Sequence, residues 1–362
     1  MNRPGRARLR STFLTVALFA GAVGVALGAS AVLVAFTHGS PGSVFTSMYD
    51  GSVNGWGSLG YTLDNAAPLL IVALGAIISV RAGQFNIGQE GQLMMGALAG
   101  ALVAIRVPGP GPVVLVVALC AAALGGAAWA GIAALLRYWR GVDVVISSLL
   151  LIFVAGQLLS YAVNNEWIIQ EHGSTTGKLA ESESISSHIR LGHLGRYPHA
   201  NAGAGFLLAI ALAVIVSAVL ARSRWGFRLR ILGLNPVAAR RAGINAALIG
   251  GAAIVLSGAF AGLAGGVVLT STAYRLTPTI SNNIGWSGLL VALVARNNSG
   301  AAVATALLFG AAEAGGSFLS TAGIATDLVP IVQALVVLGV VLPPALLHLR
   351  AYRRNAPAVV MA

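Results

Sequence analysis

Charged residues are scarce in this 362-residue chain, where aspartate, glutamate, lysine and arginine together make up only 9% of the sequence. Soluble domains carry about 25% charged residues, so an ordinary water-soluble protein is excluded. Hydrophobic residues make up 57%, and the mean hydropathy is +0.85. Apolar runs of about 20 residues recur, each long enough to cross about 30 Å of hydrocarbon, where the backbone must be helical to satisfy its hydrogen bonds. The sequence therefore predicts an all-α integral membrane protein.

Cysteine and the residue patterns of enzymes are also lacking. The single cysteine, Cys120, lies inside an apolar run and cannot form an intrachain disulfide, and no Cys/His spacing resembles a metal site. The only lysine, Lys178, lies in the sequence GSTTGKL. This sequence fails as a phosphate-binding loop, because the spacing of its glycines is one residue short and Leu179 replaces the Ser or Thr that would hold magnesium. No nucleophile–base constellation is present, so we expect a chain that is not an enzyme and binds no cofactor itself.

The remaining charge is mostly arginine, and its placement predicts topology rather than nucleic-acid binding. The formal net charge is +12, but the basic residues stand in short clusters at the ends of apolar runs and not in a patch with interleaved aromatics. With the amino terminus in the cytoplasm, 17 of the 22 basic residues fall on the cytoplasmic side and five fall outside. This asymmetry predicts a multi-pass protein in the lipid bilayer with both termini in the cytoplasm.

About ten transmembrane helices are expected within one transmembrane domain, residues 1–362. The first candidate follows a basic amino terminus and exceeds the 7–15 residues of a signal-peptide core, which favours a membrane helix over a cleaved signal. The candidate spans are 12–36, 62–80, 87–106, 113–136, 143–163, 204–222, 246–270, 284–296, 300–321 and 328–347. The segments outside them include a cytoplasmic tail at 1–11, outer segments at 37–61 and 164–203, a cytoplasmic loop at 223–245 and a cytoplasmic tail at 348–362. Each outer segment has room for a short helix.

The pattern Asn-Ile-Gly-x-x-Gly occurs twice, at 86–91 and at 283–288. We call these the first and second NIG motifs. In the predicted topology the first motif heads outward and the second heads inward, so spans one to five and six to ten would form a 5+5 inverted repeat. Many transporters build a solute site near the bilayer midplane from inverted repeats with interrupted helices. The pattern favours a solute pathway, with chance recurrence in a chain of 46 glycines as the alternative.

Polar side chains gather around the first NIG motif between two apolar segments. Facing lipid would be costly for them, so we expect them to face protein or a water-filled cavity. The alternative is a polar cytoplasmic loop before a helix whose first turn is favoured by the charge of Glu90. Glu313, inside the span 300–321, could contact solute, take part in proton coupling or hydrogen-bond to a neighbouring helix. The candidate pathway residues are Gln84, Asn86, Gln89, Glu90, Gln92, Asn283, Trp286, Ser287 and Glu313.

The cytoplasmic loop 223–245 contains the pattern of a short helix with its own start and stop. Asn235-Pro236 places proline at a first helical position, and Gly243 can end the helix. This order favours a docking element over a loop that only sets topology. The residues assigned to it are Gly233, Asn235, Pro236, Ala239, Arg240, Arg241 and Gly243.

Glycines spaced four apart occur within two of the predicted spans. Gly96 and Gly100 form one GxxxG pair, and Gly258 and Gly262 form another. Small residues at this spacing allow membrane helices to approach closely, so we expect tight helix packing at both places.

Two stretches, FNIGQEGQLMMGALAGA at 85–101 and GLNPVAARRAGIN at 233–245, resemble the permease subunits of bacterial ATP-binding cassette (ABC) importers. This family includes branched-chain amino acid, ribose and nucleoside permeases, and FNIG-x-EGQ is most similar to its simple-sugar and nucleoside branch. The stretch GWSGLLVALVARNN at 285–298 is similar to a second family motif. It carries Trp286-Ser287 where an aromatic–acid pair is common, which leaves a solute role for Ser287 open. The resemblance covers about residues 60–345.

The resemblance implies a permease of the bacterial inner membrane for a polar solute, a nucleoside or a simple sugar. Its partners would be two cytoplasmic ATPases that bind ATP and Mg, a substrate-binding protein outside, and a second permease in a homodimer or heterodimer. The segment 235–243 would be the helix that couples to the ATPase. The alternatives are a proton-coupled secondary transporter that uses Glu90 or Glu313, and a membrane scaffold that transports nothing.

Overall fold

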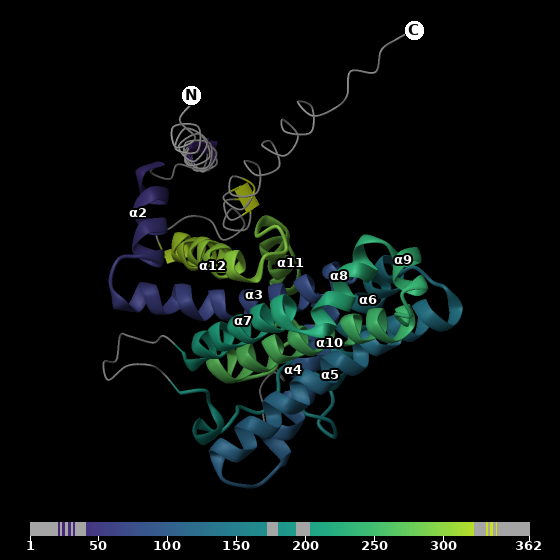
Figure 1. The fold of residues 1–362 in the computed structure, drawn as a ribbon. Helices are drawn as coiled ribbons and strands as arrows, with labels where there is room; N and C mark the ends of the chain where they lie inside the picture. The colour runs from purple at the N-terminus through teal and green to yellow at the C-terminus, as the bar shows by residue number, and fades with distance from the viewer. Residues whose placement is uncertain are drawn as a thin grey trace, which may run out of the picture. The chain divides into compact units, whose positions relative to one another are not determined.

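The computed structural model describes residues 41–171, 180–192 and 203–321, together with isolated positions between 21 and 32 and between 331 and 338 (Figure 1). Every regular element in these ranges is helical, and one isolated bridge joins Gln170 and Ser182. The elements are α2 (Pro41–Ser52), α3 (Trp56–Arg81), α4 (Gln89–Arg106), α5 (Gly111–Arg140), α6 (Val144–Val163), η1 (Ser187–Ile189), α7 (Ala204–Arg222), α8 (Arg224–Leu234), α9 (Pro236–Arg241), α10 (Ala246–Val268), η2 (Leu269–Ala273), α11 (Ile284–Val294) and α12 (Ser299–Thr321).

Each of the eight predicted spans from 62–80 to 300–321 coincides with a helix. Six helices in the described residues are long and apolar enough to cross a membrane, namely those beginning at Trp56, Gly111, Val144, Ala204, Ala246 and Ser299. The other two are α4, whose first turn is polar, and α11, which has only 11 residues. The predicted spans 12–36 and 328–347 lie outside the described ranges. The multi-pass helical architecture is therefore established for the described part of the chain.

The chain divides into two compact units. The larger unit is Leu63–Gly310, and the smaller one combines Met1–Thr62 with Ala311–Ala362. In the smaller unit, α2 packs closely against the end of α12. A side chain at position 51 would overlap Phe318, and one at position 315 would overlap Met48, so glycine at both positions allows the contact. Tyr61 meets Phe318 edge to face, with ring centroids 6.3 Å apart.

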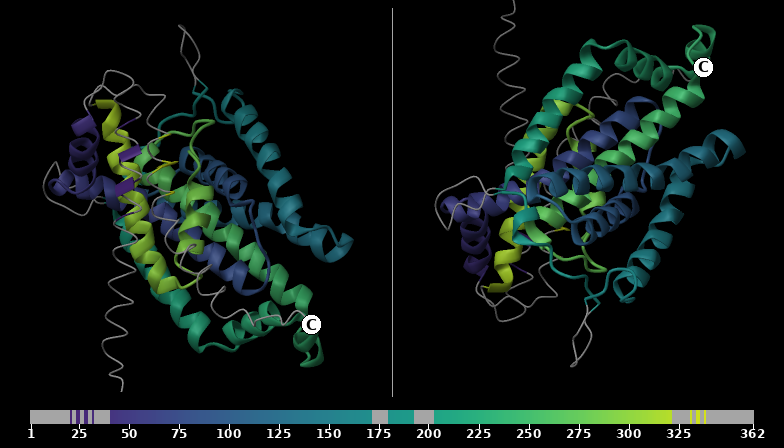
Figure 2. Two further views of the ribbon diagram at one scale, coloured as in Figure 1. Left: turned by 90° about the horizontal axis from the view of Figure 1, so that it is seen from above. Right: turned by 90° about the horizontal axis from the view of Figure 1, so that it is seen from below.

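Three helices of the larger unit, α4, α5 and α10, lie side by side (Figures 1 and 2). A methyl group on Gly96 would overlap the backbone of Gly262, and one on Gly258 or Gly262 would overlap α5 near Gly126. Gly100 also faces α5 closely. Both predicted GxxxG pairs are thus contact points where only the smallest residue lets the backbones approach.

Burial separates the inner helices from the outer ones. The most apolar stretches of α3 and α10 are 78% and 67% buried, whereas those of α5, α6 and α7 are 28% buried. Their exposed residues include Leu150, Phe153 and Val214. Large apolar side chains on the outside are what a bilayer favours, because lipid tails are as apolar as the side chains.

The segments 37–61 and 164–203, which were predicted to lie outside, each contain a short helix among their described residues, namely α2 and the single turn η1. The segment 180–192 is held to the chain that follows α10. The backbone nitrogen of Ser182 donates to the carbonyl of Leu276 at 2.9 Å, and that of Ile185 donates to Tyr274 at 2.9 Å. Arg275 forms ion pairs with Glu171 and Glu181, each at 2.8 Å. These contacts fix the irregular segment that leads into α11.

Candidate functional site

The two NIG motifs meet in space through the side chain of Glu90. One carboxylate oxygen accepts a hydrogen bond from the backbone nitrogen of Asn283 at 3.1 Å, and the other accepts from Gly285 at 2.7 Å. The Ser281 side chain also hydrogen-bonds to this carboxylate. Glu90 is buried, with 4% of its surface exposed. The first turn of a helix has backbone N–H groups without partners, and a negative charge is favoured there. Glu90 of α4 therefore caps α11. The sequence suggested a place in the solute pathway, a role in proton coupling or a contribution to its own helix, but not a cap on a distant helix.

Gly285 is required by this junction. A Cβ atom at position 285 would lie 2.5 Å from the Cα atom of Glu90 and 2.5 Å from its backbone nitrogen. Backbone atoms cannot move aside as the end of a flexible side chain can. The second glycine that both NIG motifs share, Gly288 here, packs equally closely against Val72 of α3.

The amides of the first motif form a closed network beside this junction. Asn86 and Gln92 exchange two hydrogen bonds, at 2.9 and 3.1 Å. The side-chain nitrogens of Asn86 and Gln89 both donate to the hydroxyl of Ser257 on α10, at 3.2 and 3.0 Å. All four side chains are buried and therefore face protein and not lipid, which was the expectation for the three amides.

One atom of this network has no partner among the described residues. The Oε1 atom of Gln89 is fully buried and accepts no hydrogen bond. An unsatisfied buried acceptor costs about 1–3 kcal/mol. Such a group is a natural binding point for a donor from outside the protein.

The chain between α3 and α4 is unwound, as its glycines suggested. Gly83 has a φ of +73°, a value that glycine adopts without the steric cost that other residues incur. Side chains hold the link, since Asn86 accepts from the nitrogen of Gly88 at 3.1 Å and Ser148 on α6 accepts from the nitrogen of Ile87 at 3.3 Å.

The loop 223–245, which was predicted to be cytoplasmic, touches this unwound link directly. A Cβ atom on Gly83 would lie 3.2 Å from the Cα atom of Gly233, and one on Gly233 would overlap the carbonyl of Arg81. Gly233 lies near the end of α8, two residues before Asn235, which is the N-cap residue of α9. The predicted docking element is therefore in contact with the segment that carries the first NIG motif.

The short helix α9 has the predicted start and stop. The Asn235 side chain accepts from the nitrogens of Val237 and Ala238, both at 3.0 Å, and Gly243 has a φ of +75°. Ala239 is buried, whereas Arg240 and Arg241 are exposed. The sequence missed α8, which occupies the first half of the same loop. Its signal was Ser223, whose hydroxyl accepts from the nitrogen of Gly226 at 3.0 Å.

The far end of α11 is also held by the first half of the chain. Arg81 donates to the carbonyl of Asn297 at 3.2 Å. Arg296 and Asn297 both have positive φ, near +55°, and thereby end the helix sharply. The start of α11 is thus held by Glu90 and its end by Arg81. These two residues lie on either side of the unwound link in the sequence.

The other predicted pathway residues are less enclosed. Asn283 and Trp286 are exposed, while Gln84 and Ser287 are half-buried. Glu313 is half-buried on the part of α12 that belongs to the smaller unit. Sequence reasoning missed Ser148, Ser257 and Ser281, all of them buried. For Ser257 the signal was a hydroxyl residue directly before the Gly258/Gly262 pair.

A bundle of apolar helices with two interrupted segments joined at their starts, and a loop that touches one of them through Gly233 and continues into a short capped helix, is the arrangement expected of a helical membrane transport component. The family of branched-chain amino acid transport system permease components matches residues 58–341, and this chain belongs to that family. It is therefore a transport component rather than an enzyme.

Three relatives are similar over most of their length. A glucose ABC transporter permease protein of Haloferax volcanii is 34% identical over 86% of this chain and 83% of its own. A guanosine ABC transporter permease protein of Bacillus subtilis is 31% identical over 91% of this chain and 93% of its own. A nucleoside ABC transporter permease protein of Lactococcus lactis is 26% identical over 89% of each. No solved structure matches this chain.

Proposed function

We propose that this chain is the membrane-spanning permease subunit of an ABC importer that carries a nucleoside or a simple sugar across the cytoplasmic membrane. The observation that carries the proposal is the junction between Glu90 and α11, at which the two NIG motifs form one polar centre. Relatives named for glucose, guanosine and nucleosides support the solute class. A neutral solute rich in hydroxyl groups suits the amides and hydroxyls of this centre. The unpaired Gln89 oxygen would accept one of the solute's hydrogen bonds once the pathway opens.

The length of α11 supports a site near the middle of the membrane. Eleven residues span about 16 Å, roughly half of the 30 Å hydrocarbon core. A helix that ends beside Arg81 at one membrane boundary therefore starts near the midplane. The ten-span, 5+5 inverted topology with both termini in the cytoplasm is part of the proposal and is supported by the distribution of basic residues along the sequence.

The contact between Gly233 and Gly83 supplies a route for coupling. Closure of two partner ATPases, which would hold ATP and Mg, would displace α9 at its exposed face. The backbones of α8 and of the unwound link touch directly at Gly233 and Gly83. A displacement of α8 would therefore reach the first NIG motif without being absorbed by a flexible side chain. A substrate-binding protein would deliver solute at the outer side, and a second permease, identical or different, would complete the pathway.

Uptake by the complex, reconstituted in vesicles with its ATPases and binding protein, tests the proposal. The double variant Arg240→Glu/Gly243→Pro is expected to abolish ATP-driven uptake of labelled guanosine or glucose, with normal expression. Arg140→Glu, at the exposed end of α5, is the matched control and should leave uptake unchanged. Normal uptake by the double variant would overturn the docking role of α9.

A proton-coupled transporter is the alternative, with Glu90 as the proton carrier. The contacts of Glu90 favour capping instead, because backbone N–H groups already donate to both of its oxygens. Collapsing the proton gradient while ATP is maintained separates the two. Uptake that stops under these conditions would favour the proton-coupled alternative.

A further inference from the structure

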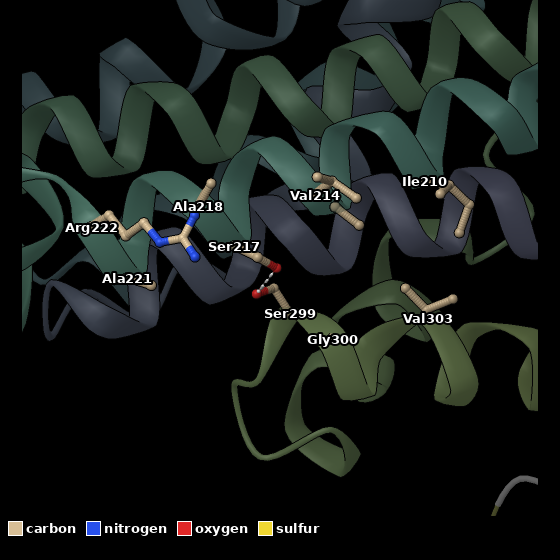
Figure 3. Close-up of a pocket in the computed structure, with 10 residues that line it drawn as sticks. Ile210, Val214, Ser217, Ala218, Ala221, Arg222, Ser299, Gly300 and Val303 are labelled. Carbon is tan, nitrogen blue, oxygen red and sulfur yellow. Dashed lines mark hydrogen bonds between the residues drawn. The ribbon is translucent and has the colours of Figure 1, made fainter.

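A long groove lies between α7 and the start of α12, away from the NIG motifs (Figure 3). It encloses about 410 Å³. Ile210, Val214, Ala218 and Arg222 follow one another along it at intervals of four residues, which places them on one face of α7. Val303 of α12 forms part of the opposite wall. The groove is thus apolar along most of its length and ends at an arginine.

The dimensions of the groove match one leaflet of a bilayer. From Ile210 to Arg222 the helix rises about 18 Å, and half of the hydrocarbon core is about 15 Å. Ser217 and Ser299 share a hydrogen bond of 2.6 Å across the groove. Figure 3 shows the Arg222 guanidinium directed back along α7 toward this pair.

Positive charge collects at the end of the groove. A second hollow of about 540 Å³ shares Ala221 and Arg222 with it and adds Arg224, Phe227 and Arg228. No acidic residue lines either hollow. Within the described ranges, Arg222 makes no ion pair and no hydrogen bond, although three arginines stand together. An anion at this end would therefore relieve their mutual repulsion and complete the coordination of Arg222.

We propose that this groove binds one anionic phospholipid, with its phosphate at Arg222 and one acyl chain along α7 beside Val303. Basic pockets between membrane helices bind anionic headgroups, and an apolar channel of one-leaflet length suits the chain attached to such a headgroup. The leaflet is the cytoplasmic one if the proposed topology holds, since α8 and α9 follow Arg222 directly. Lipid binding does not depend on transport, so the proposal can fail or hold separately from the proposed function.

Native mass spectrometry of the full-length chain in detergent tests this site. The probes are dioleoylphosphatidylglycerol and dioleoylphosphatidylcholine, which have the same acyl chains but an anionic and a zwitterionic headgroup. We expect the native chain to retain phosphatidylglycerol preferentially. Arg222→Gln should weaken phosphatidylglycerol binding about fivefold, the value of one arginine at an anionic membrane surface, and leave phosphatidylcholine unaffected. Arg140→Gln is the control, because Arg140 also ends a membrane helix but stacks on Trp139 outside the groove.

Two further measurements keep the result decisive. Ala218→Trp fills the apolar part of the groove and should release phosphatidylglycerol although Arg222 is intact. Glycerol 3-phosphate, which has the charge but no acyl chains, should not compete. Competition by glycerol 3-phosphate, equal retention of both lipids, or the same affinity in Arg222→Gln and Arg140→Gln would each overturn the proposal. A variant with Cys120→Ser and Val214→Cys carries one cysteine, which lines the groove. A cross-link from that cysteine to a second protein chain would also overturn the proposal.

Discussion

The carboxylate of Glu90 accepts a hydrogen bond of 2.7 Å from the backbone nitrogen of Gly285, 195 residues further along the chain. Each residue belongs to one NIG motif, so the two motifs are parts of one structural unit. The acidic residue of the first motif supplies the cap, and the second motif supplies the free backbone N–H groups. The glycine of the second motif gives the cap room to approach. This division of roles explains why the two six-residue windows differ at the positions between their glycines.

Removal of the Glu90 carboxylate should destabilise the protein in a graded way. Glu90→Ala leaves two N–H groups without an acceptor, and each such loss costs about 1–3 kcal/mol when buried. Glu90→Gln keeps one acceptor oxygen and should cost about half as much. Thermal unfolding of the detergent-purified chain can be monitored by size-exclusion chromatography. We expect the unfolding midpoint to fall from the native chain to Glu90→Gln and further to Glu90→Ala. An unchanged midpoint for Glu90→Ala would show that the cap contributes nothing to stability.

Gly285→Ala should disrupt the junction between the two NIG motifs. The added methyl group meets backbone atoms of Glu90 at 2.5 Å, so α4 and α11 must separate and the cap must weaken. Gly156→Ala in α6 is the control, since a Cβ atom there meets nothing within 4 Å and alanine favours the helix by about 1 kcal/mol. We expect lowered solute uptake and a lower unfolding midpoint for the first variant and neither for the second. Equal behaviour of the two variants would contradict the close contact.

The sequence predicted the helices well because their signals are local. Apolar length set the spans between 62 and 321, and Asn235-Pro236 set the start of α9, without reference to the rest of the chain. The clustering of Gln89, Asn86 and Gln92 was also predictable, because polar groups cannot face lipid. What could not be predicted was Ser257 as their partner, since a lone serine in an apolar span carries no sign of which helix it will face.

The cap of α11 by Glu90 was unpredictable for the same reason. Its acceptor and its donors are far apart in sequence, and only the packing of α4 brings them together. The repeated pattern indicated that both segments were special, yet it did not indicate contact. The groove beside Arg222 was likewise hidden, since its arginines read as topology signals and its apolar stripe reads as an ordinary membrane helix.

Gly233→Ala should separate ATP hydrolysis from transport. A methyl group there overlaps the carbonyl of Arg81 and would push α8 away from the unwound link. The assembled complex should keep its basal ATPase activity, because α9 itself is untouched, but lose most of the increase caused by solute-loaded binding protein. Gly251→Ala is the control, since its nearest neighbour would be Tyr138 at an ordinary 3.6 Å. Full stimulation in Gly233→Ala would exclude this contact as the route of coupling.

The segment 164–203 offers a comparison between an exposed ion pair and a buried hydrogen bond. Arg275 pairs with Glu171 and Glu181, but its side chain and that of Glu171 are 35% and 40% exposed, so water screens the attraction. The hydrogen bond that Arg275 donates to Glu171 raises the pKa of Arg275, which keeps the arginine charged at any pH used for the measurement. Exposed ion pairs contribute about 0–1 kcal/mol, so Arg275→Gln should lower stability only slightly.

Ser182→Ala in the same segment should cost more, although it removes no charge. The Ser182 hydroxyl is fully buried and accepts from the backbone nitrogen of Leu276 at 2.9 Å, and its loss leaves that N–H group without a partner at a cost of about 1–3 kcal/mol. Hydrogen exchange at Leu276 and the unfolding midpoint measure the local and global effects of the two variants. We expect faster exchange and the larger drop in midpoint for Ser182→Ala. If Arg275→Gln proves the more damaging, the ion pairs and not the buried hydroxyl hold the segment that leads into α11.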